Sequence, residues 1–440
     1  MSEEFFYPAK EVPPERAVLV GAVLRGQDRE EEEDNLIELA QLATAAGAKV
    51  LQAVVQERRA PDVGTYIGKG KVEELKEICR RREANLIVFD NELSPVQARN
   101  LESLTDTNVC DRSELILDIF AQRARTKQAR LQVELAQLEY LRPRLRRMWE
   151  HLSRQAGGIG TRGPGETQLE VDRRRLGERV SRLKRELEKI ERISETKARR
   201  RRHQAFTIAL VGYTNVGKSS IMNALTRAEQ HVEDALFATL DSTTRRLTST
   251  SSEAVLVTDT VGFVRKLPHH LVESFKATLA EVREADLLLH VADLSSPTRD
   301  RQIAAVEEVL GDLDIDPDST LRVFNKVDIL DARSLALEFQ VRWPGAILVS
   351  AQTGEGLPEL KEEILRCHQE AFKECVLLVP VGLESLTGKI YAAAEVADVR
   401  YREEGTYYRL RLEAPVKERL LGLGVKERDR LLENWDEEGN

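Results

Sequence analysis

The 440-residue sequence has no long apolar run, no Cys-x-x-Cys pair and no basic leader. Its longest apolar stretches, such as the one within residues 285–292, fall far short of the roughly 20 residues that cross a bilayer. The acidic first residues argue against a signal peptide. The cysteines, Cys79, Cys110, Cys367 and Cys375, suit a reducing cytoplasm and lack the spacing of a zinc or disulfide framework. We expect a cytoplasmic protein without a membrane span, whose membrane contact, if any, is at the surface.

Charge is unevenly spread along a chain whose net charge is -9. Residues 121–202 hold about 24 Lys and Arg against about 11 Asp and Glu. A basic segment in an acidic protein suggests contact with a polyanion, most often nucleic acid. A solvated helix face explains the charge alone equally well.

The length exceeds what one hydrophobic core supports, so several domains are expected. In residues 1–115, strand-like and helix-like segments alternate. Strands are predicted at residues 18–23, 50–56, 84–90 and 107–110, and helices at 35–45, 72–82 and 94–104. The last helix is expected to begin with Ser94 as its N-cap and Pro95 in its first turn. This alternation predicts an N-terminal α/β domain with a parallel sheet.

Residues 116–200 have a different pattern, in which leucines recur at intervals of three and four. One series is Leu131, Leu135, Leu138 and Leu145, and the other is Leu176, Val180, Leu183, Leu187 and Ile190. The glycine-rich run GGIGTRGPGETQ at residues 157–168 interrupts them and cannot continue a helix. We predict two long antiparallel helices packed seam to seam, with this run at the tip. A disordered linker remains the alternative for the glycines.

Residues 201–370 contain a P-loop motif after an apolar strand and before a helical pattern. Its residues are Gly212, Tyr213, Thr214, Asn215, Val216, Gly217, Lys218 and Ser219. Glycines let such a loop wrap tightly, so that backbone N–H groups and the helix N-terminus face phosphates. Lys218 is predicted to contact the β- and γ-phosphates, and the Ser219 hydroxyl to ligate Mg²⁺.

Two later motifs predict the metal and base contacts. In the first, Asp259, Thr260, Val261 and Gly262, a strand ends at an aspartate suited to hold Mg²⁺ through water, and the Gly262 N–H reaches the γ-phosphate. The second comprises Asn325, Lys326, Val327 and Asp328. The Asp328 carboxylate can accept two hydrogen bonds from guanine, which adenine cannot offer. The backbone N–H groups of Ser350, Ala351 and Gln352 are expected to reach guanine O6.

A switch segment is expected between the first two motifs, at residues Leu236, Phe237, Ala238, Thr239, Leu240 and Asp241. Thr239 is predicted to ligate Mg²⁺ and to bind the γ-phosphate, which would order the segment only with a triphosphate. A plain strand threonine is the alternative. Phe263 stands where many such proteins place a water-orienting glutamine, so we expect slow intrinsic hydrolysis that a partner accelerates.

Residues 371–440 are predicted to form a small C-terminal α+β domain. Strands are expected at residues 376–381, 398–403 and 407–413, and helices at 385–396 and from about residue 416. The fold class is therefore α/β, with a P-loop GTPase domain, an N-terminal α/β domain, a helical hairpin and this unit.

The chain resembles the HflX family of ribosome-associated GTPases. The resemblance is carried by YIGKGK at residues 66–71, FDNELSPVQARN at 89–100 and the glycine-rich run at 157–168. LFATLD at 236–241 and DTVGF at 259–263 add to it, and Ser242 departs from the proline common there. For residues 68–71 a strand-to-helix turn with exposed lysines competes with an anion contact.

The resemblance implies GTP and Mg²⁺ as ligands, GTP hydrolysis, and in some members hydrolysis of ATP. It also implies binding to the large ribosomal subunit and its RNA, near the peptidyl-transferase region, and dissociation of stalled ribosomes. We expect a monomer. A ribosome-assembly GTPase, or an RNA-binding module in which GTP supports folding, remain alternatives.

Overall fold

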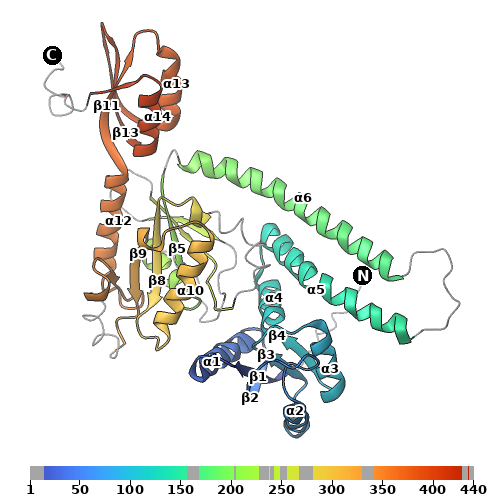
Figure 1. Cartoon of the computed structure of the whole chain (residues 1–440). Helices are drawn as coiled ribbons and strands as arrows, with labels where there is room; N and C mark the ends of the chain where they lie inside the picture. Colours follow the sequence, from blue (N-terminus) through green and yellow to red (C-terminus); the bar gives the residue numbers. More distant parts are fainter. Residues whose placement is uncertain are drawn as a thin grey trace, which may run out of the picture. The chain divides into compact units, whose positions relative to one another are not determined.

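The computed structural model describes residues 14–155, 168–202, 205–226, 237, 242–247, 255–266, 281–329, 341–428 and 435 (Figure 1). The chain divides into two compact units. Unit 1 comprises Met1–Ile190, Glu233–Asp241 and Val261–Thr278, and unit 2 comprises Glu191–Val232, Ser242–Thr260 and Leu279–Asn440. No helix in the described ranges is long and apolar enough to span a membrane.

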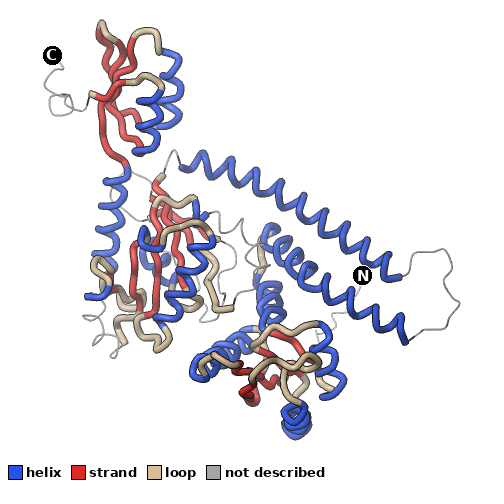
Figure 2. Tube along the Cα trace, in the orientation of Figure 1, coloured by secondary structure: helices blue, strands red, loops and turns tan. Residues whose placement is uncertain are grey.

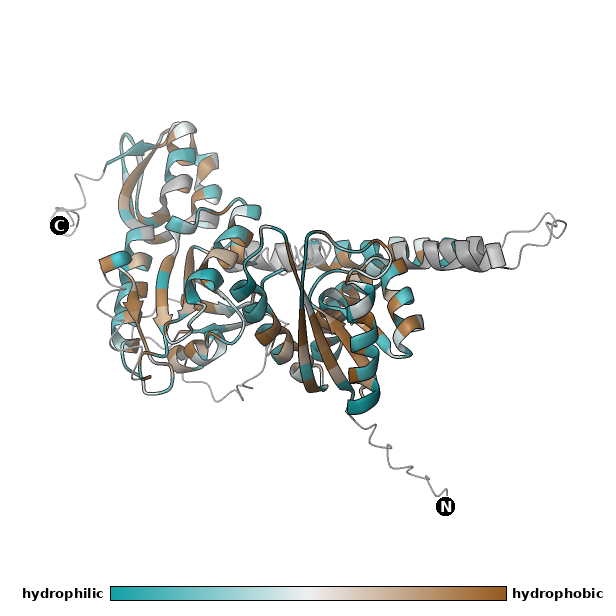
Figure 3. Ribbon diagram, turned by 60° about the horizontal axis from the view of Figure 1, so that its bottom comes forward, coloured by the Kyte–Doolittle hydropathy of each residue, from teal (hydrophilic) through white to brown (hydrophobic). Residues whose placement is uncertain are grey.

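Unit 1 begins with the predicted parallel α/β domain. Its strands are β1 (Arg16–Leu24), β2 (Lys49–Arg58), β3 (Leu86–Phe89) and β4 (Asn108–Asp111), in the order β2-β1-β3-β4. Its helices are α1 (Arg29–Ala45), α2 (Lys69–Arg82), α3 (Pro95–Thr105) and α4 (Arg112–Arg123). Apolar side chains of β1 and β3 form one buried core with those of α2 and α3. In Figure 3 the strands of this domain are mostly brown, and the helices beside them carry teal segments.

Local capping explains where two of these helices begin. Ser94 caps α3 and Pro95 lies in its first turn, as predicted, and Gln97 completes a reciprocal capping box with Ser94. Helix α1 begins earlier than expected, because the Asp28 side chain accepts from the Glu30 N–H and acidic residues favour the first turn.

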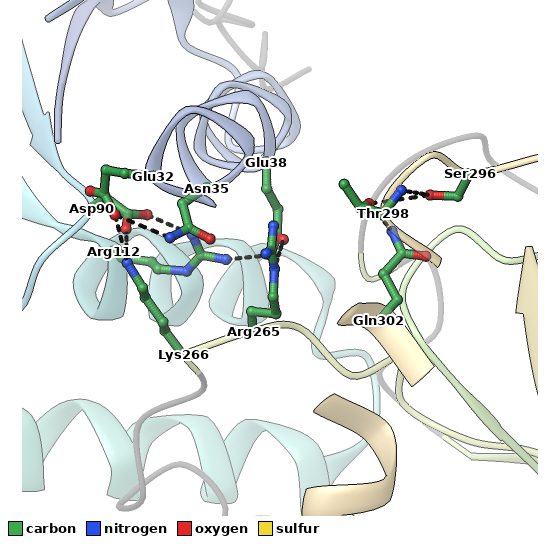
Figure 4. Close-up of polar contacts among 10 residues, drawn as sticks. All are labelled: Glu32, Asn35, Glu38, Asp90, Arg112, Arg265, Lys266, Ser296, Thr298 and Gln302. Carbon is green, nitrogen blue, oxygen red and sulfur yellow. Dashed lines mark hydrogen bonds and ion pairs between the residues drawn. The ribbon is translucent and has the colours of Figure 1, made fainter. Parts of the chain in front are cut away.

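A cluster of buried charges links α1, the end of β3 and the start of α4 (Figure 4). Arg112, 2% exposed, donates from Nη1 to Asp90 Oδ1 at 2.7 Å and from Nη2 to Glu38 Oε1. Asn35 Nδ2 donates to Glu32 Oε2 at 3.1 Å. Two buried carboxylates thus pair with the Arg112 guanidinium, and the third, Glu32, is also buried, which leaves an excess of negative charge in these elements.

The segment Val261–Lys266 supplies the missing positive charge within the same unit. Lys266 Nζ contacts Asp90 Oδ2 and lies 3.2 Å from Glu32 Oε2, and Arg265 Nε lies 3.4 Å from Glu38 Oε2 (Figure 4). Burial alone would raise the pKa of Asp90, but Arg112 and Lys266 outweigh it and hold that pKa below its usual range.

The hairpin helices are α5 (Lys127–Gln155) and α6 (Gln168–Arg202), which run in opposite directions (Figure 2). Most of the seam that the leucine spacing predicted is present, without Leu176, and the side chain of Leu145 lies outside the described ones. Buried Leu131, Leu135, Val180, Leu183 and Leu187 pack together, with Leu138 and Ile190 at the margin. Arg179 bonds both carboxylate oxygens of Glu134 across the seam. The predicted tip, residues 157–167, lies outside the described residues.

Unit 2 contains a six-stranded sheet in the order β10-β9-β8-β5-β7-β6. Its strands are β5 (Phe206–Gly212), β6 (Thr243–Arg246), β7 (Val255–Asp259), β8 (Leu287–Asp293), β9 (Leu321–Asn325) and β10 (Ile347–Leu348), and β6 alone of these runs antiparallel to its neighbour. Its helical elements are α7 (Lys218–Thr226), α10 (Arg299–Asp312), η1 (Pro317–Ser319) and α12 (Leu357–Ala371). The carboxyl ends of β5, β7, β8 and β9 meet at one edge, where the sequence places its motifs.

The C-terminal part has the order β11-η2-α13-β12-β13-α14-β14. The bounds are β11 (Phe372–Pro380), η2 (Glu384–Leu386), α13 (Thr387–Ala393), β12 (Glu395–Arg402), β13 (Gly405–Glu413), α14 (Ala414–Gly422) and β14 (Lys426–Glu427). The sheet order is β12-β13-β11-β14, with every pairing antiparallel. Helix α13 is shorter than predicted, and the short strand β14 was not predicted.

The charge cluster yields a stability prediction. Arg112→Ala should lower the free energy of unfolding by about 3–5 kcal/mol, because it leaves buried carboxylates without their central partner. Chemical denaturation followed by circular dichroism measures this change. Arg29→Ala is the control, since Arg29 forms only exposed pairs with Glu33 and Glu57. Equal midpoints for both variants would contradict a stabilising role for the cluster.

Candidate nucleotide site

The P-loop connects β5 to α7, and its two glycines hold positions that no larger residue could occupy. Gly212 has φ +154° and a Cβ there would lie 2.2 Å from the Val291 carbonyl oxygen. Gly217 has φ +92°, and its Cβ would lie 2.2 Å from Asn325 Nδ2. Asn215 also has positive φ, 61°. The loop therefore has the tight curvature that turns successive N–H groups to one side.

Lys218 is buried at the start of α7. Its ammonium donates to the carbonyl oxygens of Gly212 at 3.1 Å and Tyr213 at 2.7 Å. Burial lowers the pKa of Lys218 to about 8, although the negative charge of Asp259 partly opposes this. The loop thus holds a cation that a polyphosphate would stabilise.

Ser219 and Asp259 come together from α7 and the end of β7. Ser219 Oγ donates to Asp259 Oδ2 at 2.5 Å, and Asp259 is 1% exposed. A hydroxyl beside a carboxylate is the oxygen donor set that Mg²⁺ prefers. Thr214 Oγ1 is buried and has no hydrogen-bond partner among the described residues, so the loop retains an unused polar atom. These features fit a magnesium-bound phosphate.

Asn325 joins two loops that are far apart in the sequence. Its Nδ2 donates to the Val216 carbonyl at 2.9 Å, and its Oδ1 accepts from the Ala351 N–H at 3.0 Å. Next to it, Lys326 has φ +69° and donates to the Asn215 carbonyl at 3.0 Å and to Asp293 Oδ2 at 2.6 Å. Three predicted motifs therefore meet at β5, β9 and the loop after β10.

The residues predicted to contact a base lie beside this junction. Val327 is buried, Asp328 is half-buried, and no described residue donates a hydrogen bond to the Asp328 carboxylate. Ser350 is fully buried and its hydroxyl accepts from the Thr353 N–H at 3.0 Å, while Gln352 is exposed. A half-buried carboxylate beside a loop N–H suits a ligand edge with both donors and acceptors.

Asp293 is a site residue that the motif analysis did not identify. It ends β8, is largely buried, and forms an ion pair with Lys326. The available signal was an aspartate directly after an apolar strand, in the same position that Asp259 has after β7. Thr260, directly after β7, has a structural role, since its hydroxyl donates to the Leu210 carbonyl of β5 at 2.6 Å.

The remaining predicted residues belong to unit 1. Ala238, Thr239, Leu240 and Asp241 lie outside the described residues. Phe237 is buried and its ring meets that of Phe120 edge to face at a centroid distance of 4.6 Å. Val261, Gly262 and Phe263 are buried. Phe263 has no polar atom in its side chain to orient water.

Comparison with known proteins gives matches along most of the chain. Residues 33–121 match the model of a GTP-binding GTPase N-terminal region, 123–201 that of a GTP-binding GTPase middle region, and 207–326 that of a 50S ribosome-binding GTPase. GTPase HflX of Caldanaerobacter subterraneus is 44% identical, covering 92% of this chain and 93% of its own length. GTPase HflX of Lacrimispora saccharolytica is 48% identical, covering 89% and 92%.

A GTP-binding protein from Sulfolobus solfataricus, solved with GDP, is among the similar structures. It is 24% identical, with a TM-score of 0.42, and the match covers 81% of this chain and 99% of that one.

The lowered pKa of Lys218 predicts pH-dependent nucleotide affinity. Above pH 8 the free protein loses the proton that the phosphates require, so GTP affinity should be about tenfold weaker at pH 9 than at pH 7. The sign is opposite for folding: the penalty of a buried ammonium shrinks, and the protein becomes more stable, as pH rises from 8 toward 10.5. Fluorescent-nucleotide titration measures the affinity, and Lys218→Met should bind weakly without this pH dependence. An unchanged affinity in the parent protein would refute the assignment.

Asp328→Asn should reverse the base preference. An amide presents a donor where the carboxylate accepts, so guanine loses its match and xanthine, with a carbonyl at C2, gains one. We expect GTP affinity to fall roughly a hundredfold and XTP affinity to rise, measured by competition with a labelled nucleotide. Asp312→Asn, at an exposed end of α10, is the matched control. Retained GTP preference would remove Asp328 from the base site.

Proposed function

This chain belongs to the HflX family of GTPases and hydrolyses GTP, and we propose that its GTP-bound form binds the large ribosomal subunit and dissociates stalled or stressed ribosomes. The observation that most supports the nucleotide-binding part of this proposal is the junction at Asn325, whose side chain bonds both the P-loop and the loop at Ala351. A nucleotide held there contacts motifs that the sequence separates by more than a hundred residues.

Each site residue has a role in this proposal. The P-loop backbone, Gly212 to Gly217, holds the phosphates, and Lys218 neutralises the β- and γ-phosphates. Asp328 selects guanine, with the N–H groups of residues 350–352 at O6 and the stem of Lys326 beside the ring. Gly262 donates its N–H to the γ-phosphate. Thr239 adds a further contact to the γ-phosphate when a triphosphate is present.

Mg²⁺ fits the same site. Ser219 would ligate it directly, Thr239 would add a ligand, and Asp259 would hold it through water. The ion supplies positive charge to the β- and γ-phosphates as charge moves onto the leaving group. Because Phe263 replaces a water-orienting residue, the nucleophilic water is positioned by groups that a bound ribosome orders, which keeps hydrolysis slow in the free protein.

Four domains divide the work in this proposal: residues 1–115, the hairpin at 116–200, the G domain at 201–370 and residues 371–440. The hairpin contacts ribosomal RNA. It combines a rigid leucine seam with exposed arginines, among them Arg142, Arg174 and Arg175. Arginine bonds phosphate with two N–H groups and stacks on bases, so a stiff basic rod suits entry into folded RNA. The separation of subunits then follows from the bound GTP form, and release follows hydrolysis.

A hairpin variant tests this proposal. Arg174→Glu with Arg175→Glu should weaken sedimentation with large subunits in the GTP form and reduce its salt dependence by about two ion equivalents. The same variant should bind GTP normally but lose the stimulation of hydrolysis by large subunits. Lys189→Glu, exposed farther along the same helix, is the matched control.

Three outcomes would distinguish ribosome dissociation from the alternative functions. Binding confined to immature subunits would favour a role in assembly. Hydrolysis that ignores ribosomes, with RNA affinity independent of nucleotide, would leave GTP a structural ligand. Unchanged sedimentation of the double variant would exclude the hairpin as the contact.

A further inference from the structure

The C-terminal sheet has one face covered by helices and one face without a helix. Strands β11 and β13 direct Cys375, Leu377, Tyr408 and Leu410 to the covered face, where they pack with α13 and α14. The order β-α-β-β-α-β with sheet order β12-β13-β11-β14 places both helices on that side (Figures 1 and 2). On the opposite face, a small buried cluster includes the ring of Trp435.

Trp435 packs on this open face through both apolar and polar contacts. Its ring packs on Val376, Leu378 and Tyr407 and is 3% exposed. The Arg400 guanidinium carbon lies 4.4 Å from the centroid of the Trp435 ring. At the edge of the ring, Trp435 Nε1 donates to Asp398 Oδ2 at 2.8 Å. A flat ring with an N–H donor is therefore held by stacking and by one carboxylate.

Arginines line the rest of the same face. The pairing of β12 with β13 places Arg400 opposite Tyr407 and Asp398 opposite Arg409, so these side chains share a face. The guanidinium carbon of the exposed Arg402 lies 5.3 Å from the centroid of the Tyr407 ring. Arg411, also exposed, is two residues after Arg409 on β13, so its side chain is on the same face. Residues 371–440 as a whole are more acidic than basic, so this concentration of arginine is local.

The residue that packs on this face, Trp435, is an aromatic residue next to acidic residues in the sequence. In the sequence, Trp435 is followed by Asp436, Glu437 and Glu438. A stacked ring, an edge N–H and neighbouring negative charge are also what a nucleotide offers. Guanine presents two edge donors, N1–H and N2–H₂, to a carboxylate, whereas adenine places a lone pair at N1.

We propose that the open face of the C-terminal sheet binds single-stranded RNA, with a guanine base displacing Trp435 from its seat between Arg400 and Tyr407. Asp398 then accepts from the guanine edge, and Arg402 and Arg411 contact the adjoining phosphates. Four-stranded sheets with exposed aromatic and arginine planes are suited to splayed bases. This site is independent of the nucleotide site and of the hairpin.

The test uses the full chain with its nucleotide site filled by GDP. A fluorescein-labelled uridine heptamer with one central guanosine is titrated by anisotropy, alongside the same heptamer with central adenosine. The guanosine form should bind more tightly by about tenfold, and Asp398→Asn should abolish that difference. Arg402→Glu with Arg411→Glu should weaken both heptamers by at least about tenfold. Lys389→Glu, exposed on α13 of the covered side, should change neither.

Displacement of the ring is tested separately. Trp435→Ala removes the competitor and should tighten RNA binding severalfold. In a background that carries Trp149→Phe and Trp343→Phe, RNA should change the tryptophan emission, and adding Trp435→Phe should remove that signal. Circular dichroism checks that each variant is folded. Equal losses for Lys389→Glu and the arginine variant, weaker binding by Trp435→Ala, or a Trp435 signal that responds to acidic peptides but not to RNA would overturn the proposal, the last in favour of a protein partner.

Discussion

The neutralisation of three buried carboxylates is the interaction on which the described part of unit 1 depends. Glu32, Glu38 and Asp90 are nearly inaccessible to solvent, and Arg112 alone cannot balance them. Arg265 and Lys266 complete the balance, so the segment that follows Gly262 is fixed by charge as well as by the burial of Phe263. Because an uncompensated buried charge is costly, this segment cannot leave the cluster without a replacement cation or water. The motif that begins at Asp259 therefore starts in unit 2, and its last residues belong to unit 1.

In the nucleotide site the connecting group is a neutral side-chain amide rather than a cluster of buried charges. Asn325 donates to one loop and accepts from another, which fixes the spacing of the P-loop and the base-binding loop without adding charge. Charge is then concentrated at Lys218 and Asp259, where phosphate and metal ion are expected. A rigid neutral frame around a few buried charges keeps the site prepared before any ligand arrives.

Patterns that repeat locally were predictable from the sequence. The leucine spacing predicted the hairpin seam, and the Ser94-Pro95 pair predicted the start of α3, because both depend on neighbours within one or two turns. The motifs around Lys218 and Asn325 were recognisable since their order and spacing are constrained. The cluster at Asp90 was not, because each member alone reads as a surface charge and the partners are far apart in sequence. Strand β14 and the seat of Trp435 were missed for the same reason: two residues and one ring carry no periodicity.

Burial determines what each group of positive charges in this chain can do. Lys218 is desolvated and held by carbonyl oxygens, so it responds to a ligand with a change of protonation. Arg174 and Arg175 are exposed on a stiff helix, so they act through long-range attraction that salt weakens. Arg400 lies between these limits: its guanidinium is half-buried against a ring, and stacking rather than net charge sets its geometry. The three environments suit three kinds of contact with nucleotides, namely a buried triphosphate, a folded RNA surface and a single stacked base.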